Sequence, residues 1–278
     1  MEISSAQPQN LSLLFDDGPY DFPEISDRDL AITFLSEIDY EAQLRAIRSI
    51  LERNKEINLK SSSEIKEIER DAQTLVGVSR ERAADEWVDC LYSSVYQDAA
   101  HSMAAVGMLA PFIESLFYQG FQGIRQHFIQ MKGVPPIDHE RWRQATDDAW
   151  DCRYVWKKGK GREGITEGIM QLTTAIGLST FLPDELHRTL QALFEYRNKM
   201  FHCGFEWPVM ERSKFDRRIT DARWPNNWFS KATSNKETWV FYITDTFICH
   251  CLDTVDKVID AFGLFGRNFH QSFPRGHK

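Results

Sequence analysis

Apolar residues recur every three or four positions along most of this chain, which is the spacing of amphipathic helices. The first such stretch begins with Asp27, a residue suited to the N-cap, and continues to about residue 54. A second run, over residues 65–76, follows three consecutive serines and ends at Gly77, which favours a helix end. We therefore predict two amphipathic helices in the N-terminal part of the chain.

A longer helical region begins at Ser79 and is apolar on nearly all sides in its second half, as in the central helix of a bundle. Pro111 predicts a kink or a break within this region, because proline lacks the backbone N–H that a helix interior uses. Strand-like alternation is nowhere sustained, so the predicted fold class is all-α, a helical bundle. Further helices are expected over residues 138–154, 163–178, about 182–204, 209–220 and 237–262.

The distribution of charge separates an acidic N-terminal segment from the rest of the chain, whereas the overall composition shows only a globular protein. Hydrophobic residues make up 42% and charged residues 27%, which is the balance of a globular protein and excludes general disorder. The net charge is −8, and residues 1–27 contain six acidic residues and no lysine or arginine. We predict an acidic extended arm over 1–26, amphipathic helices over 27–78, a helical bundle over 79–265 and a tail over 266–278.

Several sequence features exclude other classes of protein. No stretch reaches the ~18 consecutive apolar residues of a membrane span, and the N-terminus lacks the basic and apolar regions of a secretory signal. Five thinly spread cysteines, an odd number, are expected to be reduced thiols of a cytoplasmic protein without a membrane partner. The acidic balance also argues against a simple electrostatic clamp for nucleic acid.

One short motif carries candidate chemistry. Arg197 and His202 are separated by four residues, the first of which is Asn198, at the end of a predicted helix. RNA can be cleaved without a metal when a base removes the proton of the ribose 2′-hydroxyl and a cation stabilises the extra negative charge on the phosphorane. An imidazole near neutral pH suits the first task and a guanidinium the second.

This motif, together with the apolar helix that contains Glu114, resembles the active motif of the HEPN superfamily, compact helical bundles of which many are ribonucleases in toxin–antitoxin, abortive-infection and CRISPR-linked systems. The resemblance covers about residues 95–262 and implies a HEPN-type bundle with additional N-terminal helices, whose site lies at a homodimer groove. It implies that His202 is the general base and that Arg197 stabilises the phosphate. Asn198 would orient His202 or the phosphate, and Glu114 would hold Arg197.

Helix geometry limits how Arg197 and His202 can cooperate, because five positions place them about 140° apart around an ideal helix. They would have to converge at a fraying helix end, or come from two copies related by a two-fold axis. Both residues also have structural interpretations. His202 could cap the helix dipole, and Arg197 could form an ordinary ion pair with Glu114 or Glu195.

Two basic clusters interleaved with aromatic residues are candidate contacts for single-stranded RNA, in which bases stack and phosphates pair with cations. A solvated surface is the alternative interpretation of both. The Cys249-His250-Cys251 run lacks the paired spacing of a zinc site, and the chain has no glycine-rich phosphate loop, so neither a metal nor another cofactor is expected. We assign RNA binding to Lys157, Lys158, Lys160, Arg162, Arg217 and Arg218.

Together these features predict a metal-independent endoribonuclease that acts on RNA as a homodimer in a toxin, stress or phage-defence role, with an antitoxin or inhibitor as a further partner. The alternative is a non-catalytic HEPN-like module that mediates dimerisation, nucleotide binding or partner binding.

Overall fold

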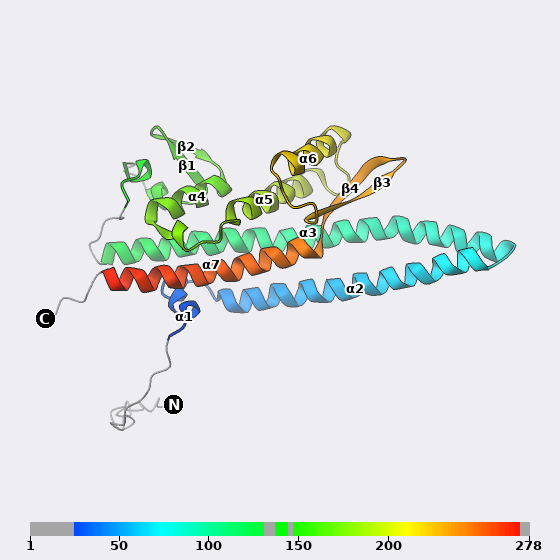
Figure 1. Ribbon diagram of the computed structural model, residues 1–278, viewed down its shortest axis with the longest axis horizontal. Helices are drawn as coiled ribbons and strands as arrows, with labels where there is room; N and C mark the ends of the chain where they lie inside the picture. The colour runs from blue at the N-terminus through cyan, green and yellow to red at the C-terminus, as the bar shows by residue number, and fades with distance from the viewer. Residues whose placement is uncertain (1–24, 131–136, 144–146, 273–278) are drawn as a thin grey trace, which may run out of the picture.

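The computed structural model describes residues 25–130, 137–143 and 147–272. Most of this part is helical, which confirms the all-α class, although two short β-hairpins are also present (Figure 1). The predicted acidic arm lies outside the described residues except for its last two positions. The helices are α1 Asp27–Ala31, α2 Tyr40–Thr74, α3 Val78–Gln130, α4 Ile165–Ile176, α5 Leu186–Cys203, α6 Val209–Asp221 and α7 Asp245–Ser272.

The long helix α3 is the axis of the structure. In Figure 1, α2 runs antiparallel beside its N-terminal part and α7 lies beside its C-terminal part, while α4, α5 and α6 lie on the other side. The far half of the α2–α3 hairpin extends beyond α7 without a third helix among the described elements. By length and composition α3 could cross a membrane, but half of its most apolar window is buried inside the protein, as in a core helix.

Helix α2 is continuous over 35 residues, so the predicted break between residues 54 and 65 was wrong. The helix predicted to begin at Asp27 is instead interrupted between Ala31, where α1 ends, and Tyr40, where α2 begins. The serines that were expected to open the second helix lie inside α2, and two of them use their hydroxyl groups, one within the helix and one across to α3. Ser63 Oγ donates to the Lys60 carbonyl at 2.7 Å, and Ser61 Oγ donates to Gln97 Oε1 of α3 at 3.2 Å. Helix α3 likewise passes through Pro111 without a break, and the proline lies on an exposed side of the helix.

The segment that precedes α4 differs from its predicted helix. Residues 138–154 contain two short 3-10 segments, Glu140–Arg143 and Asp147–Trp150, and the lysine- and glycine-rich turn is the tip of a β-hairpin. Strands β1 (Tyr154–Lys157) and β2 (Lys160–Glu163) pair antiparallel. Lys158 and Gly159 join them with φ of 52° and 74°, as a tight two-residue turn requires.

The predicted last helix also begins later than expected, because its first residues form a strand. The aromatic and β-branched run of β4 (Glu237–Ile243) pairs with β3 (Phe229–Ser234), and Asn235 and Lys236 turn between them with positive φ. Thr244 then begins α7, its Oγ1 accepting the Phe247 N–H at 3.2 Å. Helix α7 continues to Ser272, so the predicted tail starts several residues later than position 266.

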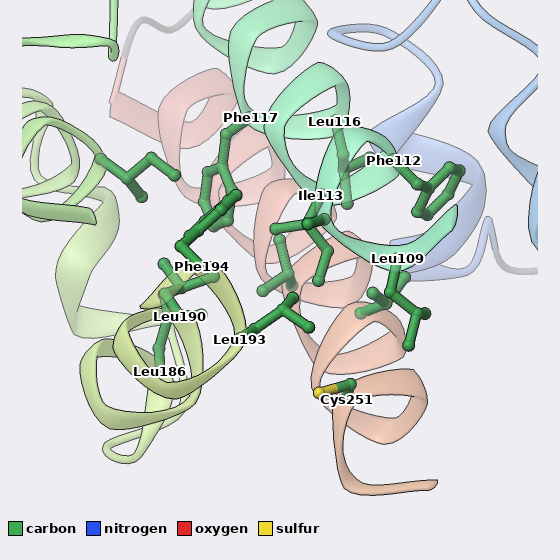
Figure 2. Close-up of a cluster of buried hydrophobic side chains, with 14 of the residues drawn as sticks. Leu109, Phe112, Ile113, Leu116, Phe117, Leu186, Leu190, Leu193, Phe194 and Cys251 are labelled. Atoms are coloured by element: carbon green, nitrogen blue, oxygen red, sulfur yellow. The ribbon is translucent and has the colours of Figure 1, made fainter. Parts of the chain in front are cut away.

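A single buried cluster joins the N-terminal helices to the rest of the fold. Ala31, Phe34 and Leu35 belong to the same apolar core as the side chains of α3, α5 and α7. Figure 2 shows the part of this core that fixes α5, in which Leu186, Leu190, Leu193 and Phe194 face an apolar stripe of α3. That packing determines which side of α5 remains open to solvent. The buried α3 side chains in this view are Leu109, Ile113, Leu116 and Phe117, with Phe112 turned toward the other side of the helix.

Candidate functional site

The predicted motif lies in the last two turns of α5. This helix ends as predicted at Gly204, whose φ of 72° is poorly accessible to other residues and whose N–H donates to the Met200 carbonyl. Because α5 is regular through Cys203, both Arg197 and His202 lie within the helix rather than at a frayed end. The idea that they converge by fraying is therefore wrong.

Arg197 lies beside Glu114, as the resemblance implies. Arg197 Nη2 is 3.9 Å from Glu114 Oε2, and both side chains are about one-third exposed. The guanidinium carbon lies 5.5 Å from the ring centroid of Phe194, one turn earlier on α5. Arg197 Nε is buried and has no hydrogen-bond partner among the described residues. The arginine is thus loosely paired. Its buried Nε is not accessible to a ligand, whereas its Nη groups form no hydrogen bond with the described residues and keep donors for an anion.

His202 and Asn198 lie on a different side of α5 from Arg197. Four positions apart, they share one helix face, and both are exposed. Neither forms a hydrogen bond or ion pair with the part of the chain that the structure describes. Phe201, which follows Arg197 by one turn, lies instead over Gly107 of α3, and its ring is 58% exposed. One chain therefore presents the histidine and the arginine in different directions.

The second predicted RNA-binding cluster is mostly occupied by internal contacts. Arg218 donates from Nη2 to Glu195 Oε1 at 2.6 Å and from Nε to Glu195 Oε2 at 2.8 Å. Its guanidinium also lies over the Trp224 ring, 5.7 Å from the centroid. Glu195 is thus the partner of Arg218 and not of Arg197. Arg217 is exposed and makes one long bond, from Nε to the Ser213 carbonyl at 3.3 Å.

The first cluster, by contrast, is presented on one face of the β1–β2 hairpin. Lys157 lies directly opposite Lys160, and Arg162 lies opposite Val155, so these three cations share a face. All three are exposed, as is Lys158 at the tip, and none forms an ion pair with the described residues. Like charges opposite one another destabilise a strand pair, and a bound polyanion would relieve this repulsion.

A buried arginine that sequence reasoning missed holds this hairpin in place. Arg141 is fully buried and donates to the carbonyls of Ala149, Asp151 and Tyr154, and to Gln171 Oε1 of α4 at 2.8 Å. Burial lowers the pKa of Arg141 to about 10. Its acceptors are mostly backbone oxygens, which no sequence pattern marks.

Gln171 and Gly168 complete the support of the hairpin from α4. Gln171 Oε1 accepts the Trp156 N–H at 2.8 Å, and its Nε2 donates to the Trp156 carbonyl at 2.6 Å, so that the side chain pairs with β1 like a neighbouring strand. A Cβ on Gly168 would lie 2.0 Å from the Cys152 carbonyl oxygen. Glycine at this position therefore permits the close approach of α4 to the hairpin.

The cysteines and the histidine of the 249–251 run point to different surroundings. Cys249 is exposed, whereas Cys251 is buried in the core, and burial raises the pKa of its thiol. His250 Nε2 lies 2.8 Å from Thr189 Oγ1 of α5, and burial lowers the pKa of this imidazole. Among the residues that the structure describes, no three metal-ligating side chains form a group that could hold an ion.

Comparison of the chain with family models, with curated proteins and with solved structures gave no match. The resemblance to the HEPN superfamily therefore rests on the Arg197–His202 motif and on the helix that carries Glu114.

Proposed function

We propose that this protein is a HEPN-type, metal-independent endoribonuclease whose active site is completed by a second copy of the chain. The observation that supports it most is the placement of Arg197 beside Glu114, with an unpartnered Nε, while His202 is exposed on another face of the same helix. Two such helices related by a two-fold axis can bring the arginine of one copy to the histidine of the other.

In the proposed reaction, the imidazole of His202 takes the proton of a ribose 2′-hydroxyl, and the 2′-oxygen attacks the adjacent phosphorus. The bond from phosphorus to the 5′-oxygen breaks, and this oxygen takes up a proton from the imidazolium or from water. The products are a 2′,3′-cyclic phosphate and a 5′-hydroxyl. Arg197 of the other copy stabilises the additional negative charge on the phosphorane oxygens, and Asn198 lies one turn from His202 to orient it.

Mixing two inactive variants tests whether the site is shared between copies. Arg197→Ala and His202→Ala should each lose about 10²–10⁴ in cleavage rate with EDTA present. A mixed dimer of the two retains one complete site if the arginine and histidine come from different copies. An equal mixture should therefore recover up to about one quarter of wild-type activity. No recovery would reject the shared site, and loss of wild-type activity in EDTA would reject the metal-independent reaction.

The non-catalytic alternative also has a specific observation in its favour. Phe201, Val209 and Met210, at the end of α5 and the start of α6, are each more than half exposed. Large exposed apolar side chains close together are typical of a protein contact surface. If both single variants bind RNA or a protein partner normally and the wild type cleaves nothing, this module is the better interpretation.

A further inference from the structure

Arg153 is held in one orientation one helical turn away from the Arg197–Glu114 pair. Tyr118 follows Glu114 by four residues and so shares its face of α3. The guanidinium carbon of Arg153 lies over the Tyr118 ring, 5.0 Å from the centroid. Along one edge, Arg153 Nε donates to Asp151 Oδ1 at 2.9 Å and Nη2 donates to Oδ2 at 2.6 Å. A ring and a bidentate carboxylate together fix the plane of the guanidinium.

These two contacts leave one face of the guanidinium available. The Arg153 side chain is 52% exposed although Tyr118 lies against one face of its guanidinium, so about half of the side chain remains open to solvent. Asp151 is itself buried, and its backbone and side-chain bonds with Arg153 tie the pair to the start of β1. The orientation of the plane is therefore built into the fold and does not depend on a ligand.

Arg153 also continues the cationic face of the hairpin. Its carbonyl accepts the Gly164 N–H at 2.9 Å, which extends the β1–β2 ladder by one residue. Alternation along the strand then places Arg153 on the same face as Lys157 and its cross-strand partner Lys160, and Arg162 lies on this face opposite Val155. Arg153 thus shares the face of the hairpin lysines and contacts Tyr118, one helical turn from Glu114, which lies beside Arg197.

We propose that the Arg153 guanidinium, backed by Tyr118 and aligned by Asp151, is a stacking platform for one nucleobase of single-stranded RNA. The hairpin cations bind the phosphates on one side of this base, and the RNA strand runs from the base toward Arg197. This inference deepens the proposed function, since it takes RNA as the ligand. Arginine planes and aromatic rings are the surfaces on which proteins stack unpaired bases.

Binding to RNA with and without bases tests this platform. Anisotropy of a labelled 12-nucleotide oligoadenylate would be compared with that of an abasic ribose-phosphate strand of the same length. Arg153→Lys keeps the charge but loses the plane, so it should weaken binding of oligoadenylate about fivefold or more and change binding of the abasic strand less than about twofold. Tyr118→Leu, which changes no charge, should likewise weaken binding of oligoadenylate more than binding of the abasic strand.

A matched control is Arg143→Lys, because Arg143 is an exposed arginine of the neighbouring 3-10 segment, 3.3 Å from Asp138. It should leave both affinities unchanged. Equal losses of Arg153→Lys on both strands, no loss on either, or no RNA binding by the wild type would each overturn the platform. Thermal unfolding curves serve as a folding control, and they should show that every variant is folded at the temperature of the binding experiment. Base-dependent binding without any cleavage would retain the platform and reject the nuclease.

Discussion

Arg141 and Gln171 meet inside the fold, with Arg141 Nη1 donating to Gln171 Oε1 at 2.8 Å while the same oxygen also accepts the Trp156 N–H. A buried cation thus organises the β1–β2 hairpin, whose lysines form no ion pair with the described residues. Without the arginine, three carbonyls and one side-chain amide would lose a donor, and the bonds to the Ala149 and Asp151 carbonyls are buried.

Arg141→Met should therefore destabilise the protein by about 3–5 kcal/mol, because it leaves several buried acceptors unsatisfied. Arg141→Lys should also destabilise it, since an ammonium group cannot reproduce the planar fork. Equilibrium unfolding in urea measures both changes. Arg143→Met, in the same 3-10 segment but exposed, should stay within about 0.5 kcal/mol of wild type. A similar small effect of Arg141→Met would contradict the structural role given to Arg141.

Because Arg197 and Glu114 are only weakly paired, a substitution of Glu114 should affect RNA cleavage much more than it affects stability. Glu114→Gln removes a partly exposed ion pair at 3.9 Å, so the free energy of unfolding should change by less than about 1 kcal/mol. If Glu114 positions Arg197, RNA cleavage should nevertheless fall by roughly tenfold, mainly in kcat. Single-turnover cleavage at saturating enzyme measures this directly. Unchanged cleavage would remove Glu114 from the site.

Acid should weaken the anchor of Arg153 in a defined direction. Burial acts to raise the pKa of the Asp151 carboxyl, but the hydrogen bonds from Arg153 outweigh it, and the pKa is lowered. A carboxyl with a lowered pKa in the folded state stabilises it above the ordinary pKa of aspartate, and this contribution is lost as pH falls through the folded value. The stability difference between wild type and Asp151→Asn should thus be constant from pH 7 to pH 5 and shrink below about pH 4. A constant difference down to pH 3 would contradict this assignment.

The cysteines should react with a thiol reagent in an order set by burial. Cys249 is exposed, whereas burial raises the pKa of Cys152 to about 12 and that of Cys251 still further. A buried thiol with a raised pKa holds little thiolate and reacts slowly. In native protein Cys249 should react first, and Cys152 and Cys251 should react only on unfolding. Mass spectrometry of time-quenched samples gives the order, and early labelling of Cys251 would show that the core opens.

The sequence allowed prediction of those elements that end at strong local signals. Helix α5 ends at Gly204 and α6 covers nearly the predicted residues, because glycine and proline act through the backbone of their own neighbourhood. The residues of β4 were predicted as helix because a short apolar run fits the period of a helix or of a strand. Pairing with β3 is what makes this run a strand. The position of Arg141 depended on backbone oxygens up to 13 residues away, which only the folded chain brings together.

Only part of the candidate site could be predicted from the sequence. The proximity of Arg197 and Glu114 follows from two helices that pack through apolar stripes, which the sequence displays. The pairing of Glu195 with Arg218 was missed, because α6 and α5 meet through a connection whose path the sequence does not specify. Residue spacing alone therefore could not separate the cations that are free from those that are neutralised.

The unbroken helicity of α5 through Cys203 has a consequence for dosage. If His202 is the base and Arg197 the phosphate-binding cation of a toxin-like nuclease, as we propose, a solitary chain is inert because the two side chains face different directions, and the rate per chain rises with its own concentration until pairing is complete. Newly made protein at low copy number would then be harmless to its host. A modest increase in synthesis would then raise the total activity by more than the increase in protein concentration.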